Sequence, residues 1–520
     1  MANFLLINPS YLQTYGSNQA GLANPVYPVL GLATIAGEAR RAGHAVEILD
    51  LSYRRYDPEW LKNYVREGKF THVGISATTP LVNQMRDMSF LLKELDSNIQ
   101  VFGGGAHPSS LPVETMKESK LDAIVVGEGD ITIVELLSGR DYADIDGICW
   151  RDGDNIILNE RRPLLENLDL LAIPAWDLYP IELYAGKISK IISKYPPITT
   201  IEFSRGCVFK CDFCGSKNTM GLGYRKKSPE RCADELEYLD NLGYREALLA
   251  DDIFTSDNKW AIEVCQAIIK RKLRIRWTCT NGIRVDSANI ELFKTMKRAG
   301  CYRVHFGFES GNEKVLKAFG KGGKATLSQG IDAVDMARDA GLETWGMFMF
   351  GLSQDTPESM KDTIAYAKRV KVDVMKFGIT VPFPGTPMFD ILRRIGAIKH
   401  FNWDDYNVYN DANSIMTHPN LTWEVIKEHY HSAYVQCYYL NPRYIFRRVA
   451  RAIKSGELLW DFYYFFKFGI LLWGRVKPLE REAYAYEDKW RLLSIEPSKI
   501  GYYTPPSARK SNVIPVRSVV

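Results

Sequence analysis

Three cysteines lie close enough in the sequence to hold one metal centre. They are Cys207, Cys211 and Cys214, in the run Ser204-Arg-Gly-Cys-Val-Phe-Lys-Cys-Asp-Phe-Cys-Gly215. Structural zinc requires four protein ligands, and residues 202–225 contain no further Cys or His. An iron–sulfur cluster held by three cysteines instead of the usual four keeps one iron open. The spacing predicts an iron–sulfur centre with an open iron; the alternatives are a zinc site and three buried cysteines without a metal.

Alternating strands and helices must position this cysteine loop. Strands are expected at residues 198–203, 246–250, 275–279, 303–306, 344–350 and 374–380. Helix-length segments such as 229–242, 258–272, 326–340 and 358–370 separate them. Six such units predict a partial (β/α)6 barrel, whose site should lie at the carboxyl ends of the strands.

Polar residues and glycines follow these strands. From the second strand to the sixth they are Asp251 and Asp252, Asn281, Glu309 and Ser310, Gly351, and the run 382–387. Asn-Gly and Pro-Gly pairs form turns in any protein. Their joint placement at consecutive strand ends nevertheless indicates a ligand site.

The cysteine run resembles the CxxxCxxC signature of radical S-adenosylmethionine (SAM) enzymes, with Phe213 at the aromatic position before the last cysteine. The resemblance covers about residues 195–400 and implies a [4Fe-4S] cluster whose open iron binds the amino and carboxylate groups of SAM. One electron then cleaves SAM, and the 5′-deoxyadenosyl radical takes hydrogen from an unactivated carbon.

The same resemblance assigns SAM contacts beyond the cysteines. Asp251 and Asp252 stand where the family often has Gly-Gly-Glu, which is a departure from the usual pattern. Glu309 and Ser310 match the family's G-x-E-S-G element, and Asn281 ends the third strand.

A second alternating series occupies the first part of the chain. Its strands are expected at 4–7, 45–49, 72–76, 99–102 and 123–126, with helices at 30–42 and 82–96. Strands that alternate with helices predict a doubly wound, Rossmann-like α/β domain, which binds ligands beyond the carboxyl ends of its strands.

This domain resembles the cobalamin-binding domain of class B radical SAM enzymes. The resemblance implies that small residues at three strand ends receive the cobalamin tail: Ser76 and Thr78, Gly103 and Gly104, and Gly127 with Glu128. The loop 8–27 has no histidine that could ligate cobalt from below. His107 is expected to make local hydrogen bonds; the alternative for the whole domain is that it binds a nucleotide or nothing.

The expected organisation has five parts. They are a cobalamin-binding domain at 1–145, a hairpin and linker at 146–194, the radical SAM core at 195–415, a helical region at 416–500 and a disordered tail at 501–520. The helical region is rich in tyrosine, tryptophan and arginine, which fits packed core better than a membrane surface or a cover over a hydrophobic pocket.

Composition narrows the function classes. Hydrophobic residues make up 46% and charged residues 25%, as in soluble globular proteins, and the net charge of +4 gives no argument for nucleic acid. The nine cysteines do not form a disulfide framework, and no secretory signal is visible, so we expect a cytoplasmic protein. The stretch 458–473 is broken by Asp461 and Lys467 and is too short to span a membrane.

These features predict a cobalamin-dependent radical SAM enzyme, with a C-methyltransferase acting on an unactivated carbon of a hydrophobic or tetrapyrrole-like molecule as the first hypothesis. The expected partners are an apolar small-molecule substrate and an external electron donor of the flavodoxin or ferredoxin type. The alternatives are an oxidative cyclase of the Mg-protoporphyrin monomethyl ester type and a non-catalytic cobalamin or redox sensor. A methylthiotransferase is disfavoured because only isolated cysteines remain for a second cluster.

Overall fold

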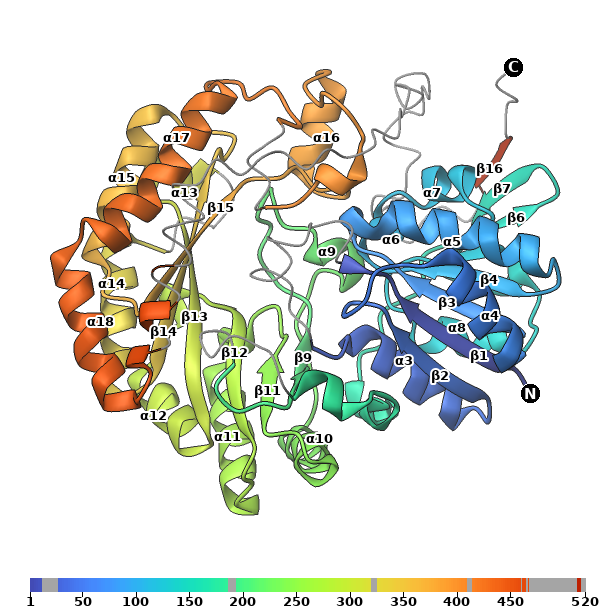
Figure 1. Cartoon of the computed structure of the whole chain (residues 1–520), viewed down its shortest axis with the longest axis horizontal. Helices are drawn as coiled ribbons and strands as arrows, with labels where there is room; N and C mark the ends of the chain where they lie inside the picture. The colour runs from blue at the N-terminus through green and yellow to red at the C-terminus, as the bar shows by residue number, and fades with distance from the viewer. Residues whose placement is uncertain are drawn as a thin grey trace.

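Two sheets lie side by side in the computed structural model, with the short helix α9 (Ser216–Thr219) between them (Figure 1). The structure describes residues 1–11, 27–185, 193–318, 325–408, 414–459, 461–463, 466 and 512–515. No helix in these ranges is long and apolar enough to cross a membrane.

The first sheet has the strand order β16-β7-β6-β5-β4-β3-β1-β2. Its parallel strands are β1 (Asn3–Asn8), β2 (Ala45–Asp50), β3 (His72–Ser76), β4 (Gln100–Gly104) and β5 (Ala123–Val125). The order reverses between β1 and β3, the point at which doubly wound sheets bind ligands. The doubly wound prediction is confirmed.

Helices cover this sheet. They are α3 (Leu30–Arg41), α4 (Pro58–Gly68), α5 (Val82–Leu95), α6 (Ala106–Ser110), α7 (Pro112–Glu118) and α8 (Asp130–Leu137). Within this set α3 contacts α8, whereas α5 contacts α4 and α7. Local sequence explains their ends: Asp57 caps α4 by accepting from the backbone N–H groups of Glu59 and Trp60, and Pro58 occupies its first turn.

An antiparallel hairpin extends the first sheet beyond β5. It consists of β6 (Ile148–Asp152) and β7 (Asn155–Leu158), and β16 (Asn512–Pro515) pairs with β7. The other residues of the expected tail, 501–511 and 516–520, lie outside the described residues.

The second sheet is the predicted six-stranded parallel barrel wall, in the order β15-β14-β13-β12-β11-β8. Its strands are β8 (Ile198–Ile201), β11 (Glu246–Leu249), β12 (Arg276–Ile283), β13 (Cys301–Glu309), β14 (Glu343–Phe350) and β15 (Val374–Ile379). The main helices between them are α10 (Pro229–Leu242), α11 (Asn258–Arg271), α12 (Ile290–Arg298), α14 (Leu327–Asp339) and α15 (Pro357–Arg369). The partial (β/α)6 barrel is therefore confirmed.

The described part of the aromatic region packs against the last barrel strand. It forms α17 (Trp423–Tyr434), the π-helical turn η9 (Val435–Tyr439) and α18 (Pro442–Ser455), at the outer edge of the barrel in Figure 1. The hydroxyl of Tyr438 accepts from the N–H of Met375 at 2.7 Å and donates to its carbonyl. Tyr434 contacts the backbone of Phe377 in the same way. These tyrosines satisfy backbone groups of β15 that have no further strand to pair with.

Candidate active site

The cysteine loop begins where β8 ends. Residues 206–215 follow β9 (Ser204–Arg205), which pairs antiparallel with β10 (Arg225–Lys226). Gly206 has φ of +83°, and a Cβ there would lie 2.7 Å from the Gly223 carbonyl oxygen. The loop therefore needs glycine immediately before Cys207.

The thiols of Cys207 and Cys214 share one electrostatic environment. Burial raises the pKa of both, and the negative charge of Asp252 raises both further. Cys207 and Glu309 also raise the pKa of Cys214. Thiols of this kind stay protonated until a positive metal centre draws off the proton.

Among the residues that the structure describes, no group of three or more His, Cys, Asp or Glu side chains is arranged to hold a single metal ion. A mononuclear ion needs all its ligand atoms about 2 Å from one point. In a [4Fe-4S] cluster each cysteine binds a different iron, so the thiols stand farther apart. The donor set fits a cluster better than zinc.

The two aspartates after β11 differ in their surroundings. Asp252 faces the cysteine loop, since its carboxylate accepts from the N–H of Gly206 at 3.2 Å. Asp251 is buried and accepts from the N–H of Phe203 at 2.7 Å and from the Ser204 hydroxyl at 2.5 Å. Burial raises the pKa of Asp251 to about 7. The carboxylate of Asp251 therefore binds groups of the protein itself, whereas the carboxylate of Asp252 lies near the thiols.

Glu309 and Ser310 also have different surroundings. Glu309 ends β13 with φ of +60°, a conformation that is strained for a residue other than glycine. Ser310 is fully buried; its hydroxyl accepts from the N–H of Asn312 and lies 3.3 Å from the Thr363 hydroxyl. Ser310 holds the turn that presents Glu309, whose charge acts on Cys214.

Asn281 and Phe213 lie at the margins of this group. The side-chain amide of Asn281 donates to the Ala250 carbonyl at 2.7 Å, which ties β12 to the end of β11. Phe213 is partly buried and packs against two apolar clusters, one of which contains residues of the N-terminal domain and the other residues of the barrel.

The loop 382–387, predicted to follow the sixth strand, and the residue after it contact the cysteine loop and the short helix that follows that loop. The N–H of Met388, in α16 (Pro387–Arg394), donates to the Asp212 carbonyl at 3.0 Å. The side chain of Asn218 donates to the carbonyl of Gly385. The first and last barrel loops therefore meet, as their common position at the strand ends predicts.

Sequence reasoning missed Arg284, just beyond β12. Its guanidinium lies 3.6 Å from the centre of the Phe209 ring, inside the cysteine loop, and its charge lowers the pKa of Cys207. It also pairs with Asp286 at 2.7 Å. The only signal in the sequence was a basic residue two positions after the Asn-Gly pair.

The N-terminal domain presents small residues at the strand ends that were expected to bind cobalamin. A Cβ on Gly103 would lie 2.6 Å from Leu121 Cδ1, and one on Gly105, where φ is +102°, would lie 2.6 Å from the Ala77 carbonyl oxygen. A Cβ on Gly104 would have no neighbour nearer than 4.0 Å. Gly103 and Gly105 are therefore needed for packing, whereas Gly104 leaves open space that a bulky group can enter.

Neighbouring positions share this accessibility. Ser76 is partly accessible at the end of β3, and Thr78 is exposed. His107 is buried and its ring lies edge-on to Trp403, with 4.7 Å between ring centres. Burial lowers the pKa of His107 to about 3, so the ring is neutral.

The third expected cobalamin position carries an ion pair instead of a free carboxylate. Glu128 accepts two hydrogen bonds from Arg225 of β10, at 3.0 and 2.5 Å. The N–H of Gly127 donates to the Ser109 hydroxyl at 3.0 Å, and Arg161 lies over Gly127. Glu128 therefore joins the N-terminal domain to the ribbon that frames the cysteine loop.

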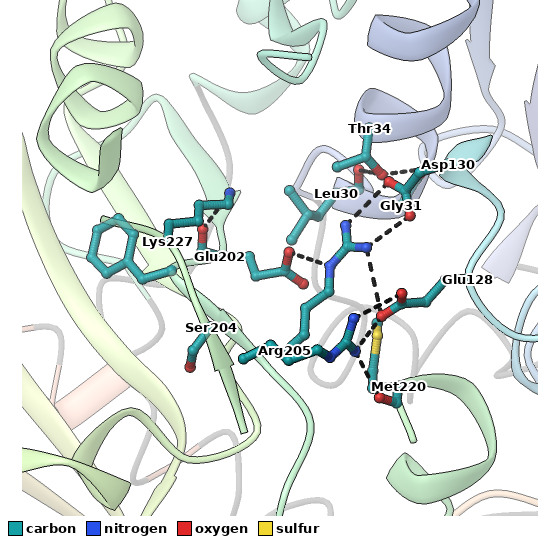
Figure 2. Close-up of polar contacts among 12 residues, drawn as sticks. Leu30, Gly31, Thr34, Glu128, Asp130, Glu202, Ser204, Arg205, Met220 and Lys227 are labelled. Atoms are coloured by element: carbon teal, nitrogen blue, oxygen red, sulfur yellow. Dashed lines mark hydrogen bonds and ion pairs between the residues drawn. The ribbon is translucent and has the colours of Figure 1, made fainter. Parts of the chain in front are cut away.

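A second, fully buried arginine makes the same connection. Arg205 of β9 donates to both carboxylate oxygens of Asp130, at 2.7 and 3.2 Å, and to Glu202 at 2.7 Å (Figure 2). Its side chain is only 4% exposed. Nearby carboxylates raise the pKa of Arg205 against the effect of burial. This pairing of distant segments was not visible in the sequence.

Comparison with known proteins follows this division. A family model described as the radical SAM superfamily matches residues 201–367, and one described as a B12 binding domain matches residues 21–137. The chain is 32% identical over 428 residues to an uncharacterized methyltransferase of Pyrococcus horikoshii, covering 81% of this chain and 90% of that protein. It is 27% identical to the anaerobic magnesium-protoporphyrin IX monomethyl ester cyclase of Rubrivivax gelatinosus, covering 78% and 72%.

A solved structure has the same two-domain fold. The radical SAM methyltransferase TsrM of Kitasatospora setae, solved with cobalamin and a [4Fe-4S] cluster bound, aligns with a TM-score of 0.63. The sequences are 20% identical, and the alignment covers 76% of this chain and 79% of TsrM.

Proposed function

The chain belongs to the cobalamin-binding radical SAM family, and we propose that within it the protein is a C-methyltransferase acting on an unactivated carbon. Its cofactors are a [4Fe-4S] cluster, SAM and cobalamin. When bound, these groups supply a radical that removes hydrogen from the substrate and a methyl group that takes its place.

In this proposal Cys207, Cys211 and Cys214 hold the cluster. Asp252 and Glu309 lie near enough to influence the thiol of Cys214, so their carboxylates are suited to receive the amino group of SAM beside the open iron. The positive φ of Glu309 is maintained by the buried turn that follows it. The carboxylates of Asp252 and Glu309 are positioned by Asp251, Ser310 and Asn281. These three side chains make hydrogen bonds to the backbone and to neighbouring hydroxyls.

Cobalamin is assigned to the edge of the first sheet, with its tail over Gly104 and beside Ser76 and Thr78. Gly104 supports this because a Cβ there would meet no protein atom nearer than 4.0 Å, so neither packing nor the backbone conformation requires glycine. Gly103 and Gly105 shape the same edge by close packing. Glu128 and Gly127 contribute at the junction with the barrel.

The observation that carries the proposal is this junction. Asp130 and Glu128 extend from the end of β5, and they bind Arg205 and Arg225 on the ribbon that begins and ends the cysteine loop. The edge assigned to cobalamin and the loop assigned to the cluster are therefore parts of one buried network. Methyl transfer to a carbon radical requires the two cofactors to face one substrate.

The methyltransferase takes precedence over the cyclase because the relative matched over 90% of its own length is named an uncharacterized methyltransferase. The ester cyclase is the second candidate, since it aligns over a similar part of this chain. We further propose a cytoplasmic protein with a small-molecule substrate, an external one-electron donor of the flavodoxin or ferredoxin type and no nucleic-acid partner. The exposed apolar side chains of α18, such as Phe446 and Ile453, support peripheral membrane contact.

The ratio of two SAM products tests the reaction. The anaerobically reconstituted protein, loaded with cobalamin, is incubated with SAM, a reductant and a small-molecule extract of the source organism. A methyltransferase should form S-adenosylhomocysteine and 5′-deoxyadenosine in equal amounts and transfer label from methyl-labelled SAM to an extract component. 5′-Deoxyadenosine without S-adenosylhomocysteine would favour the cyclase, and a Cys211→Ala variant that still forms 5′-deoxyadenosine would refute the ligand assignment.

A further inference from the structure

The side chains of β13 alternate between the outside and the inside of the barrel. Phe306 packs against Phe293 of α12, with 6.2 Å between ring centres, and Phe308 packs against Tyr366 of α15 at 5.7 Å. These residues face the outer helices. Because side chains alternate along a strand, Arg303 and His305 point into the barrel, and Gly307 lies on the same inner face.

The next two strands can be assigned in the same way. Phe348 of β14 packs against Tyr366, and Phe377 of β15 packs against Tyr434 of α17. Trp345, Met347 and Lys376 therefore point inward. The strand register sets His305 beside Trp345 and pairs Met347 with both Gly307 and Lys376.

Buried ion pairs close the lower end of this interior. Arg303 donates to Glu343 at 3.0 Å, and Lys194 and Arg451 reach the other carboxylate oxygen at 2.6 and 3.4 Å. Both Arg303 and Glu343 have side chains that are 2% exposed. Both carboxylate oxygens of Glu343 are therefore paired with cationic side chains of the protein itself.

His305 lies one level above this floor and is 6% exposed. Its ring is stacked on Trp345, with 4.7 Å between centres and an interplanar angle of 3°. Within the described part of the chain, neither ring nitrogen makes a hydrogen bond of normal geometry, and the Thr280 backbone is a weak partner. An imidazole buried in this way is costly unless a ligand completes its hydrogen bonds.

Above His305 the inward positions are more accessible than the outward ones. Gly307, Met347 and Lys376 are partly accessible, whereas the outward residues next to them on the same three strands are buried. Glu309 and Met349, one level higher, are also partly accessible. Solvent therefore reaches the barrel interior down to the level of Gly307, Met347 and Lys376, and the buried His305 lies directly below.

We propose that this interior binds a substrate with an apolar body and a carboxylate, and that His305 and Lys376 bind the carboxylate at the deep end. Trp345 and the adaptable side chain of Met347 would contact the body. The inference rests on the proposed function, because it places the target carbon between this deep end and Glu309. An imidazole N–H and an ammonium group both donate to oxygen acceptors, and the ammonium charge favours an anion over a neutral amide.

Burial lowers the pKa of His305, the positive charges of Arg303 and Lys376 lower it further, and the negative charge of Glu343 opposes them. The imidazole is consequently neutral and offers one N–H to a ligand. Thr280 lies on the neighbouring strand β12, and its backbone is a weak hydrogen-bond partner of the ring.

The test measures binding to the loaded protein with SAM present. Titration calorimetry compares straight-chain carboxylates from hexanoate to dodecanoate with the primary amides of the same lengths. The carboxylate of best length should bind the wild type about tenfold more tightly than its amide. His305→Leu and Lys376→Met should each remove most of that preference, and His305→Gln, which keeps a donor, should restore part of it.

Lys371→Met is the matched control, because Lys371 is 52% exposed and pairs with Asp335 on the outer surface. It should retain the full carboxylate preference. A far-UV circular dichroism spectrum of His305→Leu that matches the wild-type spectrum would show that the barrel is folded. Equal binding of amides and carboxylates, no binding of either series, or an unchanged preference in both variants would overturn the proposal.

These results are separable from the proposed reaction. Loss of S-adenosylhomocysteine formation with an intact carboxylate preference would refute methyl transfer and leave the binding site standing. Methyl transfer without a carboxylate preference would refute the binding site and leave the proposed reaction standing.

Discussion

At the scale of single residues, the site brings together thiols and a carboxylate whose ionised forms are disfavoured by burial. The Cys207 and Cys214 thiols have raised pKa values, and Asp252 beside them has a raised pKa as well. Such groups repel one another when they are ionised together, unless a positive centre lies between them. The arrangement is therefore suited to a metal cluster, whose charge removes the penalty.

Asp251 gives a pH-dependent prediction. Its pKa is raised to about 7 by burial, so the folded protein binds this proton more tightly than the unfolded chain. Its contribution is most favourable below the unfolded pKa of about 3.9 and is lost as the pH rises to about 7. Between about pH 5.5 and 8 we expect wild type to lose on the order of 2 kcal/mol relative to Asp251→Asn. Thermal unfolding midpoints of both proteins at the two pH values measure this, and parallel pH profiles would contradict it.

At the scale of elements, the turns and edges of the strands determine what each sheet can bind. The end of β4 and the residue before α6 include two glycines that the fold requires, Gly103 and Gly105, and one, Gly104, that it does not. On the other sheet, β15 is an edge strand. Backbone groups that have no neighbouring strand on this side form hydrogen bonds with tyrosine hydroxyls from η9 and α17. Edge protection by side chains replaces the two strands that would complete a barrel.

Gly104→Ala should leave the fold intact and weaken cobalamin binding. The added methyl group meets no protein atom nearer than 4.0 Å, but it would occupy the space assigned to the cobalamin tail. We expect an unchanged unfolding midpoint without cobalamin and a loss of about tenfold or more in cobalamin affinity, followed by visible absorbance. Gly105→Ala is the comparison, because it should destabilise the protein as well; normal cobalamin affinity in Gly104→Ala would disprove the assignment.

Tyr438→Phe should destabilise the barrel edge. The change leaves the N–H and the carbonyl of Met375 without their hydroxyl partner, at a cost of about 1–3 kcal/mol. Chemical denaturation compares it with Tyr53→Phe, whose hydroxyl is in the other domain at a 40% exposed residue. Equal stability of the two variants would show that water satisfies β15 instead.

At the scale of the whole molecule, two domains are joined through charged groups at their functional edges. Arg205 and Arg225 of the barrel meet Glu128 and Asp130 of the N-terminal domain, on the ribbon that begins and ends the cysteine loop. A buried pair of this kind contributes little net stability compared with apolar packing, but the loss of one partner is costly. The network therefore fixes the relative position of the domains.

Arg205→Met should be more harmful than Asp130→Asn. The first change leaves Glu202 and Asp130 buried without their cation and should cost about 3–5 kcal/mol, whereas the second leaves Arg205 paired with Glu202. Differential scanning calorimetry of both variants, with Arg40→Met at the exposed Arg40–Asp177 pair as control, measures the difference. A similar effect of all three changes would argue against a buried network.

The sequence alone determined the order of the elements and the first chemical step. Hydrophobic runs of strand length separated by capped helices predicted both sheets, because such patterns are local. The cysteine spacing predicted the cluster, since the three cysteines lie in one loop. The assigned SAM and cobalamin contacts remain predictions, although the structure brings Asp252, Glu309 and Cys214 into one electrostatic group.

Only the tertiary structure distinguished the roles of residues whose sequence patterns are similar. Asp251 binds the backbone while Asp252 faces the thiols, and Glu128 pairs with Arg225, because partners 46 to 97 positions away in the chain are brought beside them. The stacked His305 and Trp345 were likewise invisible in the sequence. Ion pairs and unfilled space depend on how distant strands are set side by side, and no local pattern encodes that register.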